Sequence, residues 1–134
     1  MRFNGTYTIQ NVKTGEHRTF RIRTQKETAR FAPGKRTVAL LTGPNNELDY
    51  DSFGFVINEN IFVWSQKRGQ GKMSAYDWYA FMLQDLADNN GDKLRELGKD
   101  YRIMLEKRCI RCNRKLTHPD SIASGIGPEC ASRI

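Results

Sequence analysis

The chain has 134 residues and a formal net charge of +7 at pH 7, with 38% hydrophobic and 28% charged residues. This length fits one ordinary domain with at most a small added module, and the composition excludes both a disordered chain and a membrane protein. Apolar runs such as Val38 to Leu41 are far short of a bilayer span. The first residues show no apolar signal-peptide core, so we expect a cytoplasmic protein with no membrane partner.

The charge is unevenly distributed along the chain. Residues 1–36 carry nine Lys/Arg and two Asp/Glu, whereas residues 37–100 carry six and ten, and residues 101–134 carry seven and three. A basic first third and a basic tail around an acidic middle indicate a polyanionic partner such as nucleic acid. The alternative, which charge alone leaves equally open, is that these side chains simply lie where solvent allows.

Residues 6–23 have the pattern of a β-hairpin, in which two alternating segments flank a glycine-containing turn. In the second segment Phe20 and Ile22 are expected on one face of the strand, and Arg21 and Arg23 on the other. The pattern therefore predicts a half-buried strand with a cationic outer face.

The middle of the chain contains further β signals. Residues 25–31 are compatible with a short helix that ends at the Pro-Gly pair 33–34. Residues 37–41 predict a buried strand, and residues 53–57 and 61–64 predict a second hairpin. Residues 67–72 are rich in Gly and Lys/Arg, which indicates a flexible, basic loop.

Two helices are predicted next. Ser74 and Asp77 have the spacing of a helix cap, and apolar residues then recur at helical intervals until the Asn-Asn-Gly stop at 89–91. Residues 92–108 resemble a second helix, although residues 101–105 fit a strand as well. The whole predicts an α+β domain over residues 1–106, with an antiparallel sheet of about five strands and one or two helices, followed by a zinc-binding module over residues 107–134.

The three cysteines lie together in the last 26 residues, at positions 109, 112 and 130. Cys109 and Cys112 form a C-x₂-C turn that lets two thiolates converge on one tetrahedral Zn²⁺, and Cys130 supplies a third ligand. In a reducing cytoplasm this clustering favours a metal over a disulfide. A segment this short has too few apolar residues to form a hydrophobic core of its own, so we expect a structural zinc ion to stabilise its fold.

The sequence does not identify the fourth zinc ligand. His118 is the nearest conventional candidate, but it also fits a polar neighbour of a helix cap. The other candidates are acidic residues, the second histidine and the chain terminus: Asp120, Glu129, His17 and the C-terminal carboxylate.

This segment resembles a family of small zinc modules of unassigned function found in bacteriophage and bacterial proteins. The shared pattern is C-x₂-C-x-R-x-L-T-x-P-x-S-I-x-x-G-I-G-P-x-C, and residues 109–130 match it. The resemblance implies a treble-clef-like zinc knuckle and a phage or mobile-element origin, but no reaction. The position of His118 is often acidic in the family, which argues against a fixed role for the histidine.

Several basic residues are candidates for contacts with nucleic acid, because Lys and Arg bind phosphates whatever the base sequence. We expect one group to form a cationic face of the sheet: Arg18, Arg21, Arg23, Lys35 and Arg36. The others lie in the basic loop or in the cysteine module: Lys67, Arg68, Lys72, Arg111 and Arg114. Aromatic residues that could stack on unpaired bases are Tyr7, Trp64, Tyr76 and Trp78. For Trp64 and Trp78 we favour a place in the core.

The leading hypothesis is a non-enzymatic, phage-derived accessory protein that binds nucleic acid through its cationic surface. An alternative is an adaptor or inhibitor that docks on a host or phage protein complex, such as a polymerase or a defence system. A metal-dependent enzyme is a third option, because Asp49 and Asp51 would share one face of a strand and could bind Mg²⁺.

The zinc hypothesis predicts one Zn²⁺ per chain in the purified, reduced protein, measured by elemental analysis. Cys130→Ser should lower the zinc content to well below one per chain, because it removes one of three thiolate ligands. His118→Ala should do the same only if the histidine is the fourth ligand. Reduced wild-type protein without stoichiometric metal would contradict the hypothesis.

Overall fold

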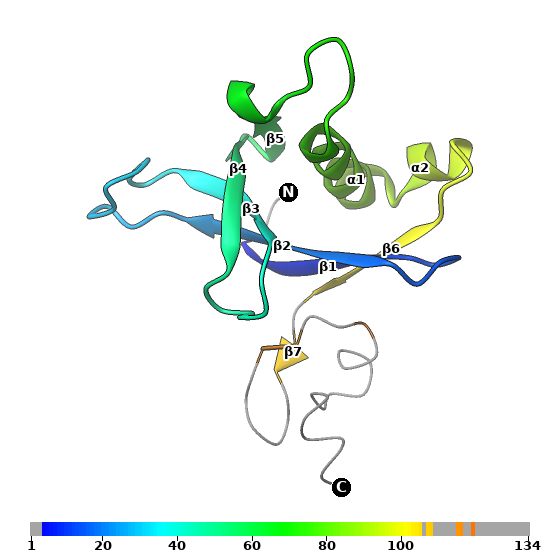
Figure 1. Ribbon diagram of the computed structural model, residues 1–134, viewed down its shortest axis with the longest axis horizontal. Coiled ribbons are helices and arrows are strands. Elements are labelled where there is room, and N and C mark those ends of the chain that lie inside the picture. Colours follow the sequence, from blue (N-terminus) through cyan, green and yellow to red (C-terminus); the bar gives the residue numbers. More distant parts are fainter. Residues whose placement is uncertain (1–3, 106, 109–114, 117–118, 120–134) are drawn as a thin grey trace, which may run out of the picture.

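The computed structural model describes residues 4–105, 107–108, 115–116 and 119 (Figure 1). It contains a six-stranded antiparallel sheet in the order β5-β4-β3-β2-β1-β6, two α-helices and a separate two-stranded pair, β7-β8. The predicted α+β class is confirmed, with six strands in the main sheet. The elements are β1 Gly5–Asn11, β2 His17–Thr24, β3 Arg36–Leu41, β4 Tyr50–Ile57, β5 Asn60–Val63, the 3₁₀ helix η1 Ser65–Lys67, α1 Ala75–Asn89, α2 Asp92–Glu96, β6 Tyr101–Leu105, β7 Lys107–Arg108 and β8 Lys115–Leu116.

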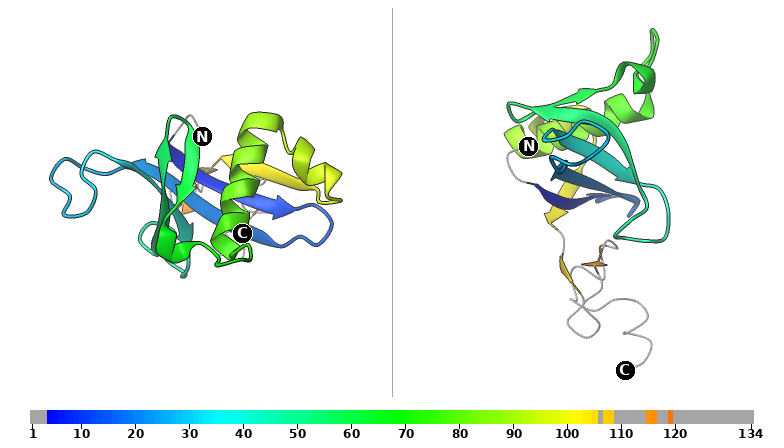
Figure 2. Two further views of the ribbon diagram at one scale, coloured as in Figure 1. Left: turned by 90° about the horizontal axis from the view of Figure 1, so that it is seen from above. Right: turned by 90° about the vertical axis from the view of Figure 1, so that its left-hand side faces the viewer.

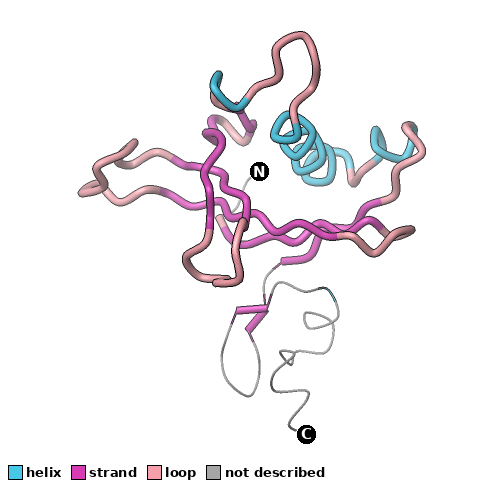
Figure 3. Tube along the Cα trace, viewed as in Figure 1, coloured by secondary structure: helices cyan, strands magenta, loops and turns pink. Residues whose placement is uncertain are grey.

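Strands β1 to β5 form a meander, in which each strand pairs with the next along the chain. The chain then crosses the sheet through α1 and returns as β6, which pairs with β1 at the opposite edge. Both helices lie on the same side of the curled sheet, and α1 runs across the strands (Figures 1 and 2). Long loops project between β2 and β3 and between β5 and α1 (Figure 3). Within the described residues neither helix is long and apolar enough to cross a membrane.

The core lies between the sheet and α1. Phe20 of β2 and Phe53 of β4 are fully buried, and their rings meet edge to face at 6.2 Å. A register shift in the β3–β4 pair, between Val38 and Ala39, makes Phe53 the extra residue of a bulge and lets it reach Phe20. Burying a phenylalanine of this size stabilises the fold by roughly 1.5–3 kcal/mol.

Helix α1 begins with the predicted cap. Ser74 and Asp77 form a capping box, in which the Ser74 hydroxyl accepts a hydrogen bond from the Asp77 N–H at 3.2 Å. The Asp77 carboxylate also accepts from the Gly69 N–H at 2.9 Å, and this bond is the largest cause of its lowered pKa. Within the predicted basic loop at residues 67–72, Lys67 ends the 3₁₀ helix η1, and Asp77 bonds Gly69 to the start of α1.

One predicted helix is not present, and a second is much shorter than predicted. Residues 25–31 form turns instead of a helix, with β2 and β3 bonded at the loop base through Gln25 N–H and Lys35 O at 2.8 Å. Residues 92–108 contain a helix only from Asp92 to Glu96, because Gly98 takes a φ of +74° that ends the helical backbone. Residues 101–105 form the strand that the sequence also allowed, and this strand pairs with β1.

Asp85 joins the two helices. Its side chain is 2% exposed, and its carboxylate accepts hydrogen bonds from the Leu94 N–H at 2.9 Å and from Asn89 Nδ2 at 3.0 Å. Burial alone would raise the pKa of Asp85, but the hydrogen bonds from Leu94 and Asn89 outweigh it and lower that pKa. The charged form of Asp85 is thus the one that the fold stabilises.

Asp85→Asn should lower the free energy of unfolding by about 2 kcal/mol at neutral pH, because a buried charged acceptor is lost. Because the folded-state pKa is depressed, this contribution is present above the ordinary aspartate value of 3.8 and disappears as the pH falls through the lower folded value. Urea unfolding of both proteins across this range measures the difference.

Asp88→Asn is the matched control, since Asp88 lies exposed on the same helix and should change stability by less than about 0.5 kcal/mol. Equal stability of Asp85→Asn and wild type at neutral pH would contradict the assigned role.

Candidate nucleic-acid interface

The sheet face opposite α1 carries an ordered row of side chains. The registers of four neighbouring strands place Arg23, Thr37, Phe55 and Phe62 directly opposite one another, from β2 to β5. Directly opposed residues point to the same face, so this row lies on the face away from the buried residue Ile22. We call this the outer face.

A second row lies beside the first on the outer face. It consists of Thr6, Arg21, Ala39 and Ser52, which are opposed across β1 to β4. Thr37 separates Arg23 from the adjacent pair Phe55 and Phe62 in the first row, and Arg21 is the one large side chain of the second row. The small side chains Thr6, Thr37 and Ala39 are almost fully buried.

Arg21 is held in place on the outer face. Its guanidinium lies 4.1 Å from the centroid of the Tyr50 ring, and its Nη1 donates to the Glu47 carbonyl at 3.2 Å. Burial lowers the pKa of Arg21, and the nearby charge of Arg23 lowers it further, against smaller opposing effects of Tyr50 and Glu47. Such a site gains from a bound anion, because the anion offsets both the burial and the repulsion.

Arg23 is the more accessible of the two arginines. Its side chain is exposed, and its Nε donates to Gln25 Oε1 at 3.1 Å at the start of the β2–β3 loop. Residues two apart on a strand are about 6.6 Å apart, so Arg21 and Arg23 present two guanidinium groups along one line.

The expectation that Arg18 and Arg36 belong to the same cationic face is corrected by the registers. Arg18 is opposite Ile9 and therefore lies on the α1 side of the sheet. Arg36 shares the face of Val38, and its Nε donates to Asn4 Oδ1 at 2.9 Å. Lys35 is exposed at the end of the β2–β3 loop.

The basic residues between β5 and α1 differ in their accessibility. Lys67 Nζ lies 3.3 Å from Asp51 Oδ2 and 5.1 Å from the centroid of the Tyr76 ring. Arg68 Nε donates to the Val63 carbonyl at 2.8 Å. Lys72 is exposed. Lys67 and Arg68 therefore have structural contacts within the chain, and Lys72 is the residue of this group best placed for an external phosphate.

An aromatic cluster on the outer face was missed by sequence reasoning. Phe31, from the β2–β3 loop, stacks on Phe55 with centroids 6.3 Å apart, and both rings meet Trp64 at 5.3 Å. Phe62 lies opposite Phe55. We call Phe31, Phe55, Phe62 and Trp64 the aromatic cluster. Trp64 is half-buried in it, whereas the sequence placed Trp64 in the core.

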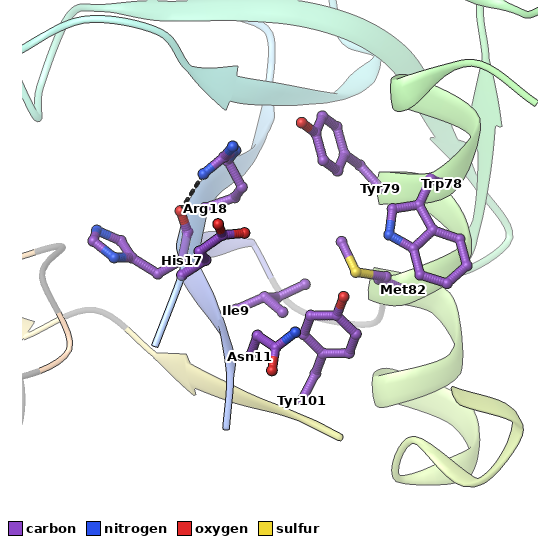
Figure 4. Close-up of a pocket in the computed structure, with 9 residues that line it drawn as sticks. Ile9, Asn11, His17, Arg18, Trp78, Tyr79, Met82 and Tyr101 are labelled. Atoms are coloured by element: carbon purple, nitrogen blue, oxygen red, sulfur yellow. Dashed lines mark hydrogen bonds between the residues drawn. The ribbon is translucent and has the colours of Figure 1, made fainter. Parts of the chain in front are cut away.

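A small pocket lies on the other side of the sheet, between β1, β2, β6 and α1 (Figure 4). Trp78, Tyr79 and Tyr101 form its aromatic walls, and Arg18 contributes a cationic group, while the His17 ring points away from them. Its volume is about 120 Å³, the room of about four water molecules, whereas sites for small organic ligands span about 300–1,000 Å³. The pocket is thus smaller than the usual site for a small organic ligand.

The two aspartates of the enzyme hypothesis have separate structural partners. Asp49 Oδ2 accepts from the Asn45 N–H at 2.7 Å in the β3–β4 turn, while Asp51 pairs with Lys67. Among the residues that the structure describes, no three His, Cys, Asp or Glu side chains are grouped for a metal ion. The geometry therefore gives the enzyme hypothesis no added support.

The predicted zinc ligands Cys109, Cys112, His118 and Cys130 lie outside the described residues, as do Arg111 and Arg114. Residues 104–134 match a family of unknown function (DUF6011). No curated protein and no solved structure matches the chain. The family match is confined to the C-terminal end, so the outer face must be interpreted from its own geometry.

Proposed function

We propose that the protein is a non-enzymatic nucleic-acid-binding protein whose outer face contacts the phosphate backbone. The observation that carries the proposal is the alternation of β2. Phe20 and Ile22 are buried beneath α1, while Arg21 and Arg23 lie side by side on the opposite face. Guanidinium groups bind phosphate oxygens in a bidentate manner, which suits this pair for a polyanion.

The surroundings of the pair support this proposal. The β2–β3 loop adds exposed Lys26, Arg30 and Lys35 against one acidic residue, Glu27. The loop therefore extends the positive charge beyond the sheet, and this charge would steer a polyanion toward Arg23.

The C-terminal module has a supporting role in this proposal. One structural Zn²⁺ would be held by Cys109, Cys112 and Cys130, with His118 as the candidate fourth ligand. The C-x₂-C spacing supports this, and the family match spans all four residues. The metal would hold the basic residues Arg111 and Arg114 in a fixed arrangement for added phosphate contacts.

The double substitution Arg21→Gln and Arg23→Gln should weaken nucleic-acid binding and flatten its salt dependence. Each phosphate contact adds about 0.9 to the slope of log K against log salt on duplex DNA and about 0.7 on single strands. Loss of two contacts should reduce the slope by about 1.8 or about 1.4, respectively. Fluorescence anisotropy across a salt series measures it.

Lys93→Gln with Lys99→Gln is the control, because it removes the same charge from exposed positions in and after α2. This control should keep the wild-type slope. Wild-type protein that binds neither DNA nor RNA at low salt would refute the proposed function, and the adaptor hypothesis would replace it.

A further inference from the structure

The aromatic cluster is unusual because two of its rings are open to solvent. Phe31 is 53% exposed and Phe62 is 45% exposed, and they flank the half-buried Phe55. A fold gains little from phenylalanine rings in water, so two exposed rings beside two half-buried ones indicate a surface that contacts a partner.

The structure holds Phe31 in a defined position. The Phe31 carbonyl accepts a hydrogen bond from Gln25 Nε2 at 3.3 Å, and the Phe31 ring rests on Phe55 and Trp64. The next residue, Ala32, has a φ of +45°, in the left-handed region that costs an alanine about 1 kcal/mol. Backbone strain of this kind is concentrated at binding sites.

Phe62 is positioned by a close approach of two strands. A Cβ at residue 54 would lie only 2.5 Å from the Phe62 carbonyl oxygen, so β5 approaches β4 this closely because residue 54 is glycine. This approach fixes Phe62 beside Phe55 on the outer face.

Two arginines belong to the same part of the molecule as these rings. Arg23 belongs to the same cross-strand row as Phe55 and Phe62, and Arg30 immediately precedes Phe31. Aromatic rings interleaved with cations match single-stranded nucleic acid, in which bases are free to stack while phosphates follow the cations. In a duplex the bases are paired and stacked on one another, so their faces are not accessible for stacking on Phe31.

We propose that the aromatic cluster stacks on unpaired bases, which makes single-stranded nucleic acid the preferred ligand of the outer face. This inference rests on the proposed function and specifies its substrate class. Arg21 and Arg23 bind the backbone, while Phe31 and Phe62 bind the bases.

The test compares a single-stranded oligonucleotide of about 12 nucleotides with a duplex of the same length, by fluorescence anisotropy. Phe31→Ala with Phe62→Ala should weaken single-strand binding by about tenfold or more, and change duplex binding by less than about twofold. The salt slope should stay at the wild-type value, because no phosphate contact is lost.

Val12→Ala with Leu97→Ala is the matched control, because it truncates two other exposed apolar side chains, 53% and 60% exposed. A second readout is Trp64 fluorescence in a Trp78→Phe background, which a stacked base should quench. Equal affinity for single strand and duplex, with no effect of the phenylalanine substitutions, would overturn the stacking inference and leave the proposed function intact. Absence of binding to either oligonucleotide would overturn both.

Discussion

The alternation of side chains along β2, β3 and β4 is the constraint on which the surface depends. Both helices lie on the same side of the sheet (Figure 1), so on β2 and β3 alternate residues face the core and the outer face. On β4 the bulge at Phe53 shifts this alternation, so that Phe53 is buried in the core while Phe55 lies on the outer face. Phe20 and Val38 face the core, and Arg21 lies with Phe55 on the outer face. A shift of one residue in the pairing of the strands would move the buried side chains to the outer face and the others to the core. Burial of the apolar face therefore also fixes the positions of the cations and rings on the outer face.

Hydrogen bonds also hold two loops in defined positions beside the strands. Asp77 ties Gly69 to the start of α1, and Gln25 bonds the Phe31 carbonyl within the β2–β3 loop. In the proposed function, such bonds would reduce the conformational entropy that the loops lose when nucleic acid binds. On the helical side of the sheet, the carboxylate of Asp85 joins α1 to α2.

Local patterns were sufficient to predict most of the fold. Both hairpins, the buried strand at residues 37–41 and the Ser74 cap depend on side chains that are neighbours in the sequence, so periodicity and capping identify them. Strand β6 was harder, because its partner β1 lies some 90 residues away and only the tertiary structure decides between helix and strand. The aromatic cluster was missed for the same reason, since Phe31 contacts Phe55 only after strands β2, β3 and β4 have paired. Arg18 was assigned to the wrong face because it was grouped with Arg21 and Arg23 by charge. It lies an odd number of residues from both on β2, so its side chain lies on the opposite face of the sheet.

We propose that the outer face is the surface that contacts nucleic acid. Changes in amide chemical shift on binding identify the contacted residues one by one. In an NMR titration of the isotope-labelled protein with a single-stranded oligonucleotide, the shifts should change at residues 21–23, 31, 37, 55 and 62. Residues of the opposite side, such as Trp78 and Tyr101, should keep their positions. Changes confined to α1, α2 and the pocket between α1 and strands β1, β2 and β6 would contradict the account, because they would place the ligand on the side of the sheet that the helices cover.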